Sequence, residues 1–405
     1  MCPPAVGCVR PESSEEPNAA ELERLRPHFA ADWEAADDLG RQVYCILGLP
    51  IDAIEMPDVL LRIEAAAAGP TPLLISTVNV NYLAFSETDP AFKASILRGD
   101  LCVIDGMPVV WLARLMDLPI RRRIAGSDVF AALKSRPTAR NLKLFLLGGD
   151  EGVAEAAARA LNQRTDRMQC VGSINPGFGS VDEMSRTEII DQINASGANF
   201  LITALGAQKG HHWLLRNHDR LRVPIRTHFG AVLNFEAGTV KRAPHRMAKF
   251  GLEWLWRIKE EPRLWRRYWR DGQVLLRLLL TQALPLALAA RLQRLRFAKR
   301  DQELRVNKAE TGTAVTLRLA GDAIAPYAGT AISELRAALN SQKQLLIDLS
   351  ATRRIDSRFF GLLLMVRKQL EGSGRRLVLT GISLRIARLF RRNGVAFLLS
   401  HEFGV

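Results

Sequence analysis

Short apolar segments that end in polar or glycine turns recur along the first 240 residues, and this recurrence constrains the fold more than any other feature. The segments cover residues 73–77, 101–104, 142–147, 200–205 and 224–229, with helix-like stretches between several of them. Strands that alternate with helices form crossover units, and crossover units build a mainly parallel sheet. The sequence therefore predicts a Rossmann-like α/β domain over residues 41–240.

Polar and glycine residues follow these predicted strands at the point where each strand ends. They are Thr77 and Asn79, Asp105-Gly106, Gly148-Gly149, and Gly206 with Gln208 and Lys209. In open α/β sheets, ligands bind beyond the carboxyl ends of the strands. We therefore expect these residues to gather along one edge of the sheet and to form the ligand site there.

The N-terminal residues and the cysteines narrow the class of protein. Residues 1–40 hold several prolines and a run of acids but no charged segment followed by an apolar one, which predicts a disordered tail and a protein that is not secreted. The five cysteines are odd in number and lack C-x-x-C spacing, so we expect free thiols instead of disulfides or a zinc site. A length of 405 residues suggests two or three domains.

Basic charge is concentrated in one segment, residues 241–300. It holds sixteen Lys and Arg against four acids, which accounts for twelve of the net fourteen positive charges of the chain. The same segment carries five Trp and Tyr residues and the apolar run 272–290. Basic charge beside interfacial aromatics indicates an anionic lipid surface and argues against nucleic acid. The side chains expected to contact the membrane are Arg257, Arg263, Trp265, Arg266 and Arg267.

The apolar run 272–290 is slightly short for a membrane span and contains Arg277 and Pro285. We therefore expect it to lie in the membrane surface or to dip into one leaflet. An ordinary amphipathic pair of helices packed on the core is the alternative. The expected location is the cytoplasmic face of the inner membrane, as a peripheral or monotopic protein.

Several ordered motifs in residues 45–270 resemble those of the WecG/TagA/CpsF glycosyltransferases, which build surface glycans and exopolysaccharides. The motifs are Ser76-Thr77-Val78-Asn79, Asp105-Gly106, Arg123-Ile124-Ala125-Gly126-Ser127-Asp128, Gly148-Gly149, Gly206-Ala207-Gln208-Lys209, and Glu253 to Arg267. The resemblance implies an inverting enzyme that moves a sugar from a UDP-sugar to a polyprenyl-diphosphate-linked acceptor. It also implies catalysis without a metal or another cofactor, and no cluster of His, Cys, Asp and Glu has metal-ligand spacing.

The resemblance also implies roles for individual residues. The family's proposed general base is the aspartate of the Asp-Gly motif, here Asp105, and the polar side chains of Thr77 and Asn79 line the same pocket. Taken alone, an Asp-Gly pair is often a turn, and Thr or Asn at a strand end often caps the next helix. Arg123 with Asp128, Gly148, Gly149, Gly206, Gln208 and Lys209 would hold the diphosphate and nucleotide.

The sequence departs from the family after Gly206-Ala207. Most relatives have Pro-x-Gln-Glu there, whereas this chain has Gln208-Lys209-Gly210-His211. This departure supports an alternative function, a catalytically impaired regulator that binds a nucleotide sugar and acts through its C-terminal domain, residues 312–405. Adjacent histidines at a helix start are usually polar surface, so we expect His211 and His212 to be exposed.

A third region, residues 312–405, follows a polar linker over residues 299–312. Its strands and helices alternate, and the region resembles a STAS domain, a small α/β fold, with the family's phosphorylatable serine at Ser357. The residues after it, Arg358-Phe359-Phe360-Gly361, are bulkier than usual for that family. The resemblance implies a protein partner for this domain, and the linker suggests that its removal leaves transferase chemistry intact.

Overall fold

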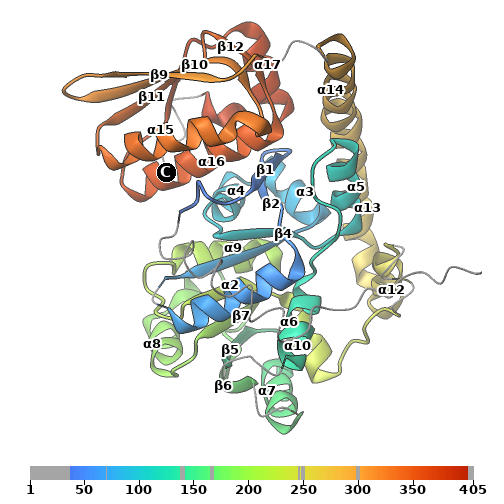
Figure 1. Cartoon of the computed structure of the whole chain (residues 1–405). Coiled ribbons are helices and arrows are strands. Elements are labelled where there is room, and N and C mark those ends of the chain that lie inside the picture. The colour runs from blue at the N-terminus through green and yellow to red at the C-terminus, as the bar shows by residue number, and fades with distance from the viewer. Residues whose placement is uncertain are drawn as a thin grey trace, which may run out of the picture. The chain divides into compact units, whose positions relative to one another are not determined.

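The computed structural model of the chain describes residues 37–69, 71–136, 142–164, 168–244, 247, 251–297 and 302–399 (Figure 1). The predicted disordered tail, residues 1–40, lies almost wholly outside these ranges. Residues from Asp38 onward belong to one compact unit.

A six-stranded parallel sheet forms the centre of the first domain, in the order β4-β3-β8-β7-β5-β6. The strands are β3 (Leu73–Val78), β4 (Leu101–Ile104), β5 (Leu142–Gly148), β6 (Met168–Ile174), β7 (Phe200–Ala204) and β8 (Ile225–His228). β3, β4 and β8 are buried along their whole length, as expected of parallel strands covered on both faces. The predicted Rossmann-like α/β fold is confirmed.

Helices connect these strands. They are α2 (Met56–Ala68), α3 (Val80–Thr88), α4 (Pro90–Leu97), α5 (Met107–Leu115), α6 (Gly126–Ser135), α7 (Val153–Arg164), α8 (Thr187–Ala195), α9 (Ala207–Arg216) and α10 (Gly230–Ala237). The helices α3, α5, α9 and α10 each begin within three residues of the end of a sheet strand. Their N-termini therefore lie along the carboxyl edge of the sheet, where backbone N–H groups favour anions.

A two-stranded hairpin precedes the sheet and was not predicted. β1 (Val43–Ile46) pairs antiparallel with β2 (Leu49–Asp52). Its turn has positive φ at Leu47 and Gly48, and a Cβ on Gly48 would lie 2.4 Å from the Gly394 carbonyl oxygen. Glycine is therefore required where the hairpin meets the C-terminal domain.

The basic segment folds into α12 (Glu253–Glu260), the short turn η2 (Pro262–Leu264), and α13 (Trp265–Leu278), which continues through the π-helical turn η3 (Leu279–Ala283) into α14 (Leu284–Phe297). Pro262–Leu292 is the one helix among the described residues whose length and apolar composition would let it cross a membrane. One face packs on the transferase core through Leu278, Ala283 and Ala287. The buried Asp271 accepts a hydrogen bond from Asn81 Nδ2 of α3 at 3.2 Å.

The opposite face of this long helix is exposed and apolar. We call it the outer stripe: Trp265, Trp269, Leu276, Leu280, Leu288 and Leu292, each more than half exposed. A helix packed along one side on its own domain cannot also be surrounded by lipid. For the packed face, the structure agrees with the alternative of amphipathic helices packed on the core. The outer stripe remains accessible to a membrane surface.

The C-terminal domain has a mixed sheet in the order β12-β10-β11-β13, with β9 antiparallel to β10. Its elements are β9 (Arg305–Glu310), β10 (Ala314–Ala323), α15 (Ala328–Asn340), β11 (Gln344–Asp348), β12 (Thr352–Ile355), α16 (Ser357–Gly372), β13 (Val378–Thr380) and α17 (Leu384–Arg392). The smaller α/β domain is as predicted, but β9 lies inside the segment that we expected to be a polar linker.

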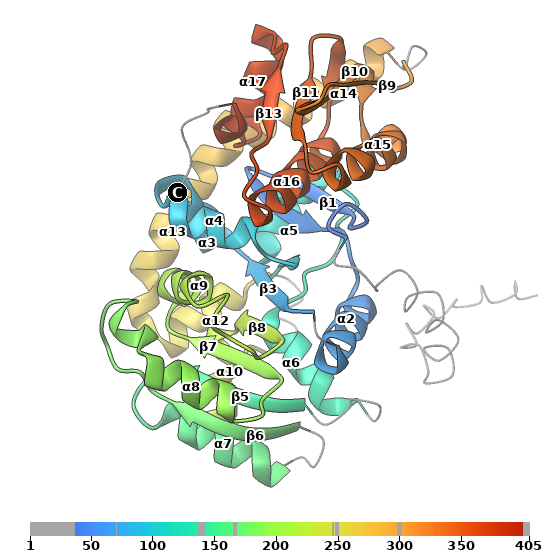
Figure 2. The ribbon, with the colours of Figure 1, turned by 90° about the vertical axis from the view of Figure 1, so that its left-hand side faces the viewer.

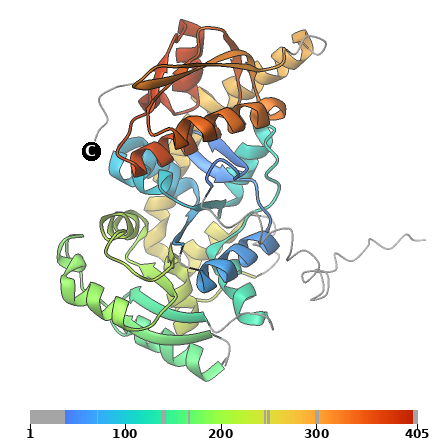
Figure 3. The same cartoon turned by 60° about the vertical axis from the view of Figure 1, so that its left-hand side comes forward.

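The two domains share one hydrophobic cluster. Figures 2 and 3 show α16 lying along β1, and Val43 and Cys45 of β1 are fully buried in the same cluster as Phe359, Leu362 and Leu363 of α16. A Cβ on Gly361 would lie 2.2 Å from the Val43 carbonyl oxygen. Removing the C-terminal domain would expose this face of β1. The expectation that removal leaves transferase chemistry intact stays a prediction, but the polar linker is not the only connection between the two domains.

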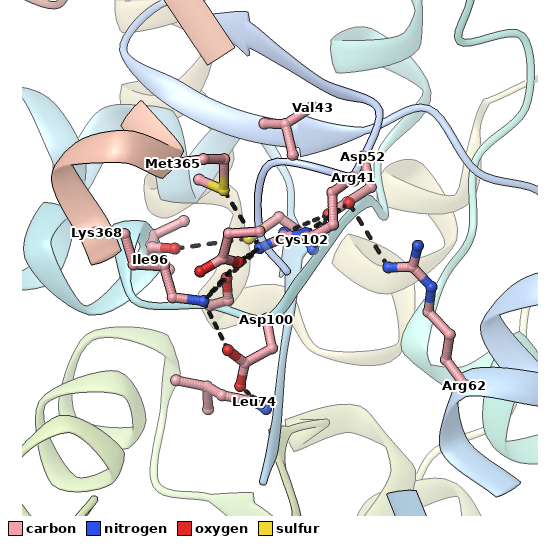
Figure 4. A network of polar contacts seen from close by, with 12 residues as sticks. Arg41, Val43, Asp52, Arg62, Leu74, Ile96, Asp100, Cys102, Met365 and Lys368 are labelled. Atoms are coloured by element: carbon pink, nitrogen blue, oxygen red, sulfur yellow. Dashed lines mark hydrogen bonds and ion pairs between the residues drawn. The ribbon is translucent and has the colours of Figure 1, made fainter. Parts of the chain in front are cut away.

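A buried polar network crosses the same interface (Figure 4). Arg41 Nε and Nη2 donate to the two carboxylate oxygens of Asp52, at 3.0 and 2.7 Å. Asp52 Oδ2 accepts the N–H of Cys102 at 2.7 Å, at the start of β4. Lys368 of α16 donates to Asp38 at 3.0 Å and to Asp100 at 2.6 Å. The C-terminal domain thus takes part in holding the beginnings of the strands that carry the candidate site.

Candidate active site

The carboxyl ends of β3 and β4 bring Thr77, Asn79 and Asp105 together, as their places in the sequence predicted. Val78 and Ile104 are paired in register, and the Asp105 N–H donates to the Val78 carbonyl at 2.9 Å. A Cβ on Gly106 would lie 3.4 Å from the Asn79 Cβ, so the backbone passes close to Asn79 at this point. Asp105 is therefore next to the β3 loop, at the edge of the sheet where ligands bind.

The Asp105 carboxylate is partly buried, and among the described residues no hydrogen bond to it is found. Burial raises its pKa to about 7, the negative charge of Glu253 adds to the increase, and Asp128 contributes further. The guanidinium groups of Arg123 and Arg257 act in the opposite direction. A carboxyl group with a pKa near neutral pH is suited to accept a proton in a general-base step.

Arg123 lies between two carboxylates. Its guanidinium forms an ion pair with Glu253, the first residue of α12, and a second pair with Asp128 of α6 at 3.2 Å. The arginine that the sequence assigned to phosphate binding therefore also ties α12 to the edge of the sheet. Asp128 is within this ion-pair cluster, where an acidic group is poorly suited to contact a phosphate directly.

Arg257 faces inward, and its assignment to the membrane surface is corrected. Its side chain is only 17% exposed, it pairs with Glu261 at 3.2 Å, and its guanidinium lies 5.5 Å from the centroid of the Phe235 ring. Its charge also lowers the pKa of Asp105. Arg263, Trp265 and Arg266 are exposed, whereas Arg267 is partly buried with its guanidinium over the Tyr268 ring.

The backbone before α12 explains how this segment reaches the site. Gly251 has a φ of +73°, and a Cβ there would lie 2.9 Å from the Met107 Cβ, on the helix that follows Asp105. Only glycine accommodates both the conformation and the close approach. Glu253 and Arg257, which lie far from Asp105 in the sequence, therefore join its surroundings.

The side chains of Asn79 and Thr77 form hydrogen bonds to the helix α3, which follows them. Asn79 Oδ1 caps α3 by accepting the N–H groups of Asn81 and Tyr82, at 3.0 and 3.3 Å. This is the capping role expected of an asparagine at the end of a strand. The buried side chain of Thr77 shares a hydrogen bond with the Tyr82 hydroxyl, which lies 2.9 Å from His211 Nε2.

His211 is fully buried, so the expectation that it belongs to the polar surface is wrong. Its ring meets Tyr82 and Phe92 edge to face, and burial holds its pKa well below the usual value. The neighbouring Gly210 is equally constrained, because a Cβ there would lie 2.4 Å from His228 Nδ1. Gly210 and His211, which stand where the resembled motif has glutamine and glutamate, are thus both closely packed in the core of the domain.

The two glycine loops lie side by side on neighbouring strands. Gly148, Gly149 and Gly206 have φ values of +99°, +86° and +79°, and the Gly149 N–H donates to the Ala204 carbonyl at 2.9 Å. Gln208 donates to the Asp89 carboxylate, and Lys209 donates to the Gly179 carbonyl at 3.0 Å. Both side chains therefore make hydrogen bonds within the protein.

Ser357 begins α16 at the interface with the hairpin. Its hydroxyl donates to the Cys45 carbonyl at 2.6 Å, while Arg358 donates to the Val43 carbonyl at 3.1 Å. Asp356 caps the helix by accepting the Phe359 N–H. A phosphate on Ser357 would have to displace the Cys45 carbonyl, so modification of this serine requires the interface to open.

The ion-pair cluster predicts opposite changes in pH dependence for two variants. Because the Arg123 charge lowers the pKa of Asp105 and the Glu253 charge raises it, Arg123→Met should move the rising limb of the pH–rate profile to higher pH, and Glu253→Gln should move it to lower pH. Initial rates from pH 5 to 9 at saturating substrate measure both. Shifts in the same direction would show that neither charge acts on the group that titrates.

Comparison with known proteins agrees with this geometry. Residues 44–288 match the family model described as Glycosyl transferase WecG/TagA/CpsF family, and residues 306–400 match one described as Mlab, STAS domain. A relative from Staphylococcus aureus strain MW2, named N-acetylglucosaminyldiphosphoundecaprenol N-acetyl-beta-D-mannosaminyltransferase, is 26% identical over 227 residues, which is 56% of this chain and 86% of the relative. A protein of the same name from strain NCTC 8325 is 26% identical over 214 residues, 52% of this chain and 82% of its own length.

Proposed function

Since this chain belongs to the WecG/TagA/CpsF family of glycosyltransferases, we propose that it moves a sugar, with inversion, from a UDP-sugar to a polyprenyl-diphosphate-linked acceptor. The Asp105 carboxylate, with its pKa raised to about 7 at the carboxyl edge of the sheet, is the observation that carries this proposal. A base of that pKa is ionised in a useful fraction at neutral pH and still takes a proton readily.

In the proposed reaction, Asp105 removes the proton from the acceptor hydroxyl as that oxygen bonds to the anomeric carbon of the donor sugar. The bond from that carbon to the UDP oxygen breaks, and UDP leaves with the electron pair. Arg123 and Arg257 would compensate the negative charge of the departing diphosphate, which requires Arg123 to give up part of its pairing with Glu253 or Asp128. Thr77 and Asn79 would position the sugars.

The glycine loops are the proposed place for the nucleotide. A Cβ on Gly206 would meet nothing within 4 Å, so a ligand can approach the backbone closely there, and the N-terminus of α9 lies directly after this residue. Gly148 and Gly149 lie beside it at the end of the neighbouring strand. Gln208 and Lys209 would exchange their contacts with Asp89 and Gly179 for contacts with the donor. Since the named relatives transfer N-acetylmannosamine to a lipid-linked N-acetylglucosamine, an N-acetylhexosamine donor and an acceptor of that kind are the first to test.

The outer stripe supports attachment to the membrane that holds such an acceptor. Arg263, Arg266 and Arg270 are exposed beside Trp265 and Trp269 at the beginning of the stripe. Arginine and tryptophan side chains at the edge of an apolar helix face are typical of proteins that lie on an anionic bilayer. We propose peripheral attachment at the cytoplasmic face of the inner membrane, with anionic inner-leaflet lipids as partners.

One assay tests the transferase proposal. UDP release is measured for a panel of UDP-sugars, with and without a polyprenyl-diphosphate-linked N-acetylglucosamine, and the anomeric configuration of the product is read by nuclear magnetic resonance. Release that depends on the acceptor, together with an inverted product, is the expected result. Binding of a UDP-sugar without any transfer would instead favour the impaired regulator suggested by Gly210 and His211.

The outer stripe gives a separate prediction about membrane binding. Replacing Trp265 and Trp269 by serine should weaken partition onto anionic vesicles by roughly ten-fold or more, because two interfacial aromatics are lost. Phe178→Ser, which removes an 85% exposed aromatic outside the stripe, serves as the matched control. Cosedimentation with vesicles measures both variants. Equal binding of the Trp265/Trp269 variant and the control would remove the stripe from the membrane surface.

A further inference from the structure

The last helix of the C-terminal domain, α17, carries four arginines and no acidic residue. Ile386 and Phe390 are buried in the domain core, where Phe390 meets Phe360 edge to face with ring centroids 4.9 Å apart. The opposite face holds Leu384, Arg388 and Arg391, which follow one another at helical spacing and are exposed. This outward face is therefore basic over the length of the helix.

These arginines differ from most of those elsewhere in the domain. Arg354 pairs with Asp322, and Arg367 pairs with Glu371. Across the described part of the chain, no ion pair or side-chain hydrogen bond is found for the four arginines of α17, which are Arg385, Arg388, Arg391 and Arg392. Leu384, in the first turn, is 81% exposed. An uncompensated basic face that ends in an exposed leucine has the chemistry that anionic lipid attracts.

The place of α17 relates this face to the outer stripe. The helix contacts η3, the π-helical turn in the middle of the long helix α13 to α14. Gly394, two residues after α17, packs against Leu47 of the hairpin, whose side chain belongs to the same cluster as Leu278 and Ala283. The C-terminal domain is thus fixed to the element that carries the apolar stripe.

We propose that α17 is the second half of the membrane-binding surface, and that Arg385, Arg388 and Arg391 contact acidic phospholipid headgroups while the outer stripe enters the interface. This inference rests on the proposed membrane attachment. The STAS-like domain then has two contact surfaces: α16 contacts the transferase domain and α17 contacts the bilayer. Its role is to hold the transferase on the lipid surface that contains the acceptor.

The experiment compares the full-length protein with Arg388→Gln/Arg391→Gln and with a matched control, Arg222→Gln/Arg305→Gln. The control loses the same charge from two exposed arginines that precede β8 and begin β9. Cosedimentation uses vesicles of phosphatidylcholine alone and with three-tenths phosphatidylglycerol, at low and high salt. The α17 variant should bind the anionic vesicles roughly thirty-fold more weakly than wild type, and the control should not. Binding to neutral vesicles and UDP release in detergent should be unchanged for both.

The outcomes separate this inference from the proposed function. Unaltered anionic-vesicle binding by the α17 variant, with binding lost in the Trp265/Trp269 variant, would overturn the role of α17 and leave membrane attachment standing; the basic face would then serve an acidic protein. No vesicle binding by wild type would overturn both. An equal loss on neutral vesicles would show that the substitutions act through the fold, and it would also overturn the inference.

Discussion

Asp105→Asn should lower the turnover number by roughly 10² or more in a protein that remains folded. Asparagine keeps the size and the hydrogen-bonding capacity of the side chain, but it cannot accept the proton of the acceptor hydroxyl. The loss should appear in kcat, because the proton moves in the chemical step and not on binding. Initial rates of UDP release with saturating acceptor measure it, and Asp191→Asn, an exposed carboxylate on α8, is the control. Near-normal turnover of Asp105→Asn would remove Asp105 from the role of base.

The stability of Asp105→Asn at different pH values tests whether the pKa of Asp105 is raised in the folded protein. The pKa of Asp105 in the folded protein is raised from 3.8 to about 7, so the folded state is favoured below pH 4, and that advantage is lost as pH rises through 7. Asparagine never ionises, so Asp105→Asn should be at least as stable as wild type at pH 8. Thermal unfolding at pH 5 and pH 8 tests this, and destabilisation only at pH 8 would contradict the raised pKa.

The sequence was informative about the sheet because its strands are continuous apolar runs bounded by glycine and polar turns. The predicted segments 73–77, 101–104 and 142–147 match β3, β4 and β5 within one residue. The sequence did not predict the hairpin of β1 and β2. Its four-residue strands are stabilised by packing on α16 and show no alternation of apolar and polar residues. The strand β9 (Arg305–Glu310) was missed because half of its residues are charged and most are exposed at a sheet edge, so it has no apolar pattern.

The candidate site was predictable only where its residues follow strands. Asp105 and Thr77 could be placed from the rule that parallel strands end at one edge. The surroundings of Asp105 could not, because Glu253 and Arg257 reach it through the turn at Gly251 and the packing of α12. His211 was misjudged because its burial depends on Tyr82 and Phe92, which lie on α3 and α4. Arg257 was assigned to the membrane surface because it belongs to a basic segment. On the helix α12, however, its side chain lies on the face that packs against the transferase domain.

Arg41→Met should destabilise the folded protein by about 3 kcal/mol, the low end of the cost of breaking a buried ion pair, because it removes the cation that donates two hydrogen bonds to the buried Asp52 carboxylate. Arg62, whose Nη1 lies 3.9 Å from Asp52 Oδ1, remains as the weaker partner. Asp52 is 4% exposed, and burial alone would raise its pKa, yet the Arg41 guanidinium holds the pKa below the usual value. A carboxyl group with a lowered pKa stabilises the fold above the pKa of the unfolded chain, and the contribution is lost as pH falls through the folded pKa. The destabilisation should therefore be full at pH 7 and smaller near pH 3. Urea unfolding at both pH values measures it.

The double variant Arg41→Met/Asp52→Asn gives the decisive comparison. Asparagine can still accept the Cys102 N–H through its carbonyl oxygen while carrying no charge, so the second substitution should recover part of the stability lost in the first. Lys368→Met should lower the free energy of unfolding by less than Arg41→Met, because the Lys368 side chain is 15% exposed and water already screens its charge in part. If Arg41→Met alone were neutral, the network would not hold the beginnings of β3 and β4, and the C-terminal domain would contribute to the transferase through the apolar contacts of α16 alone.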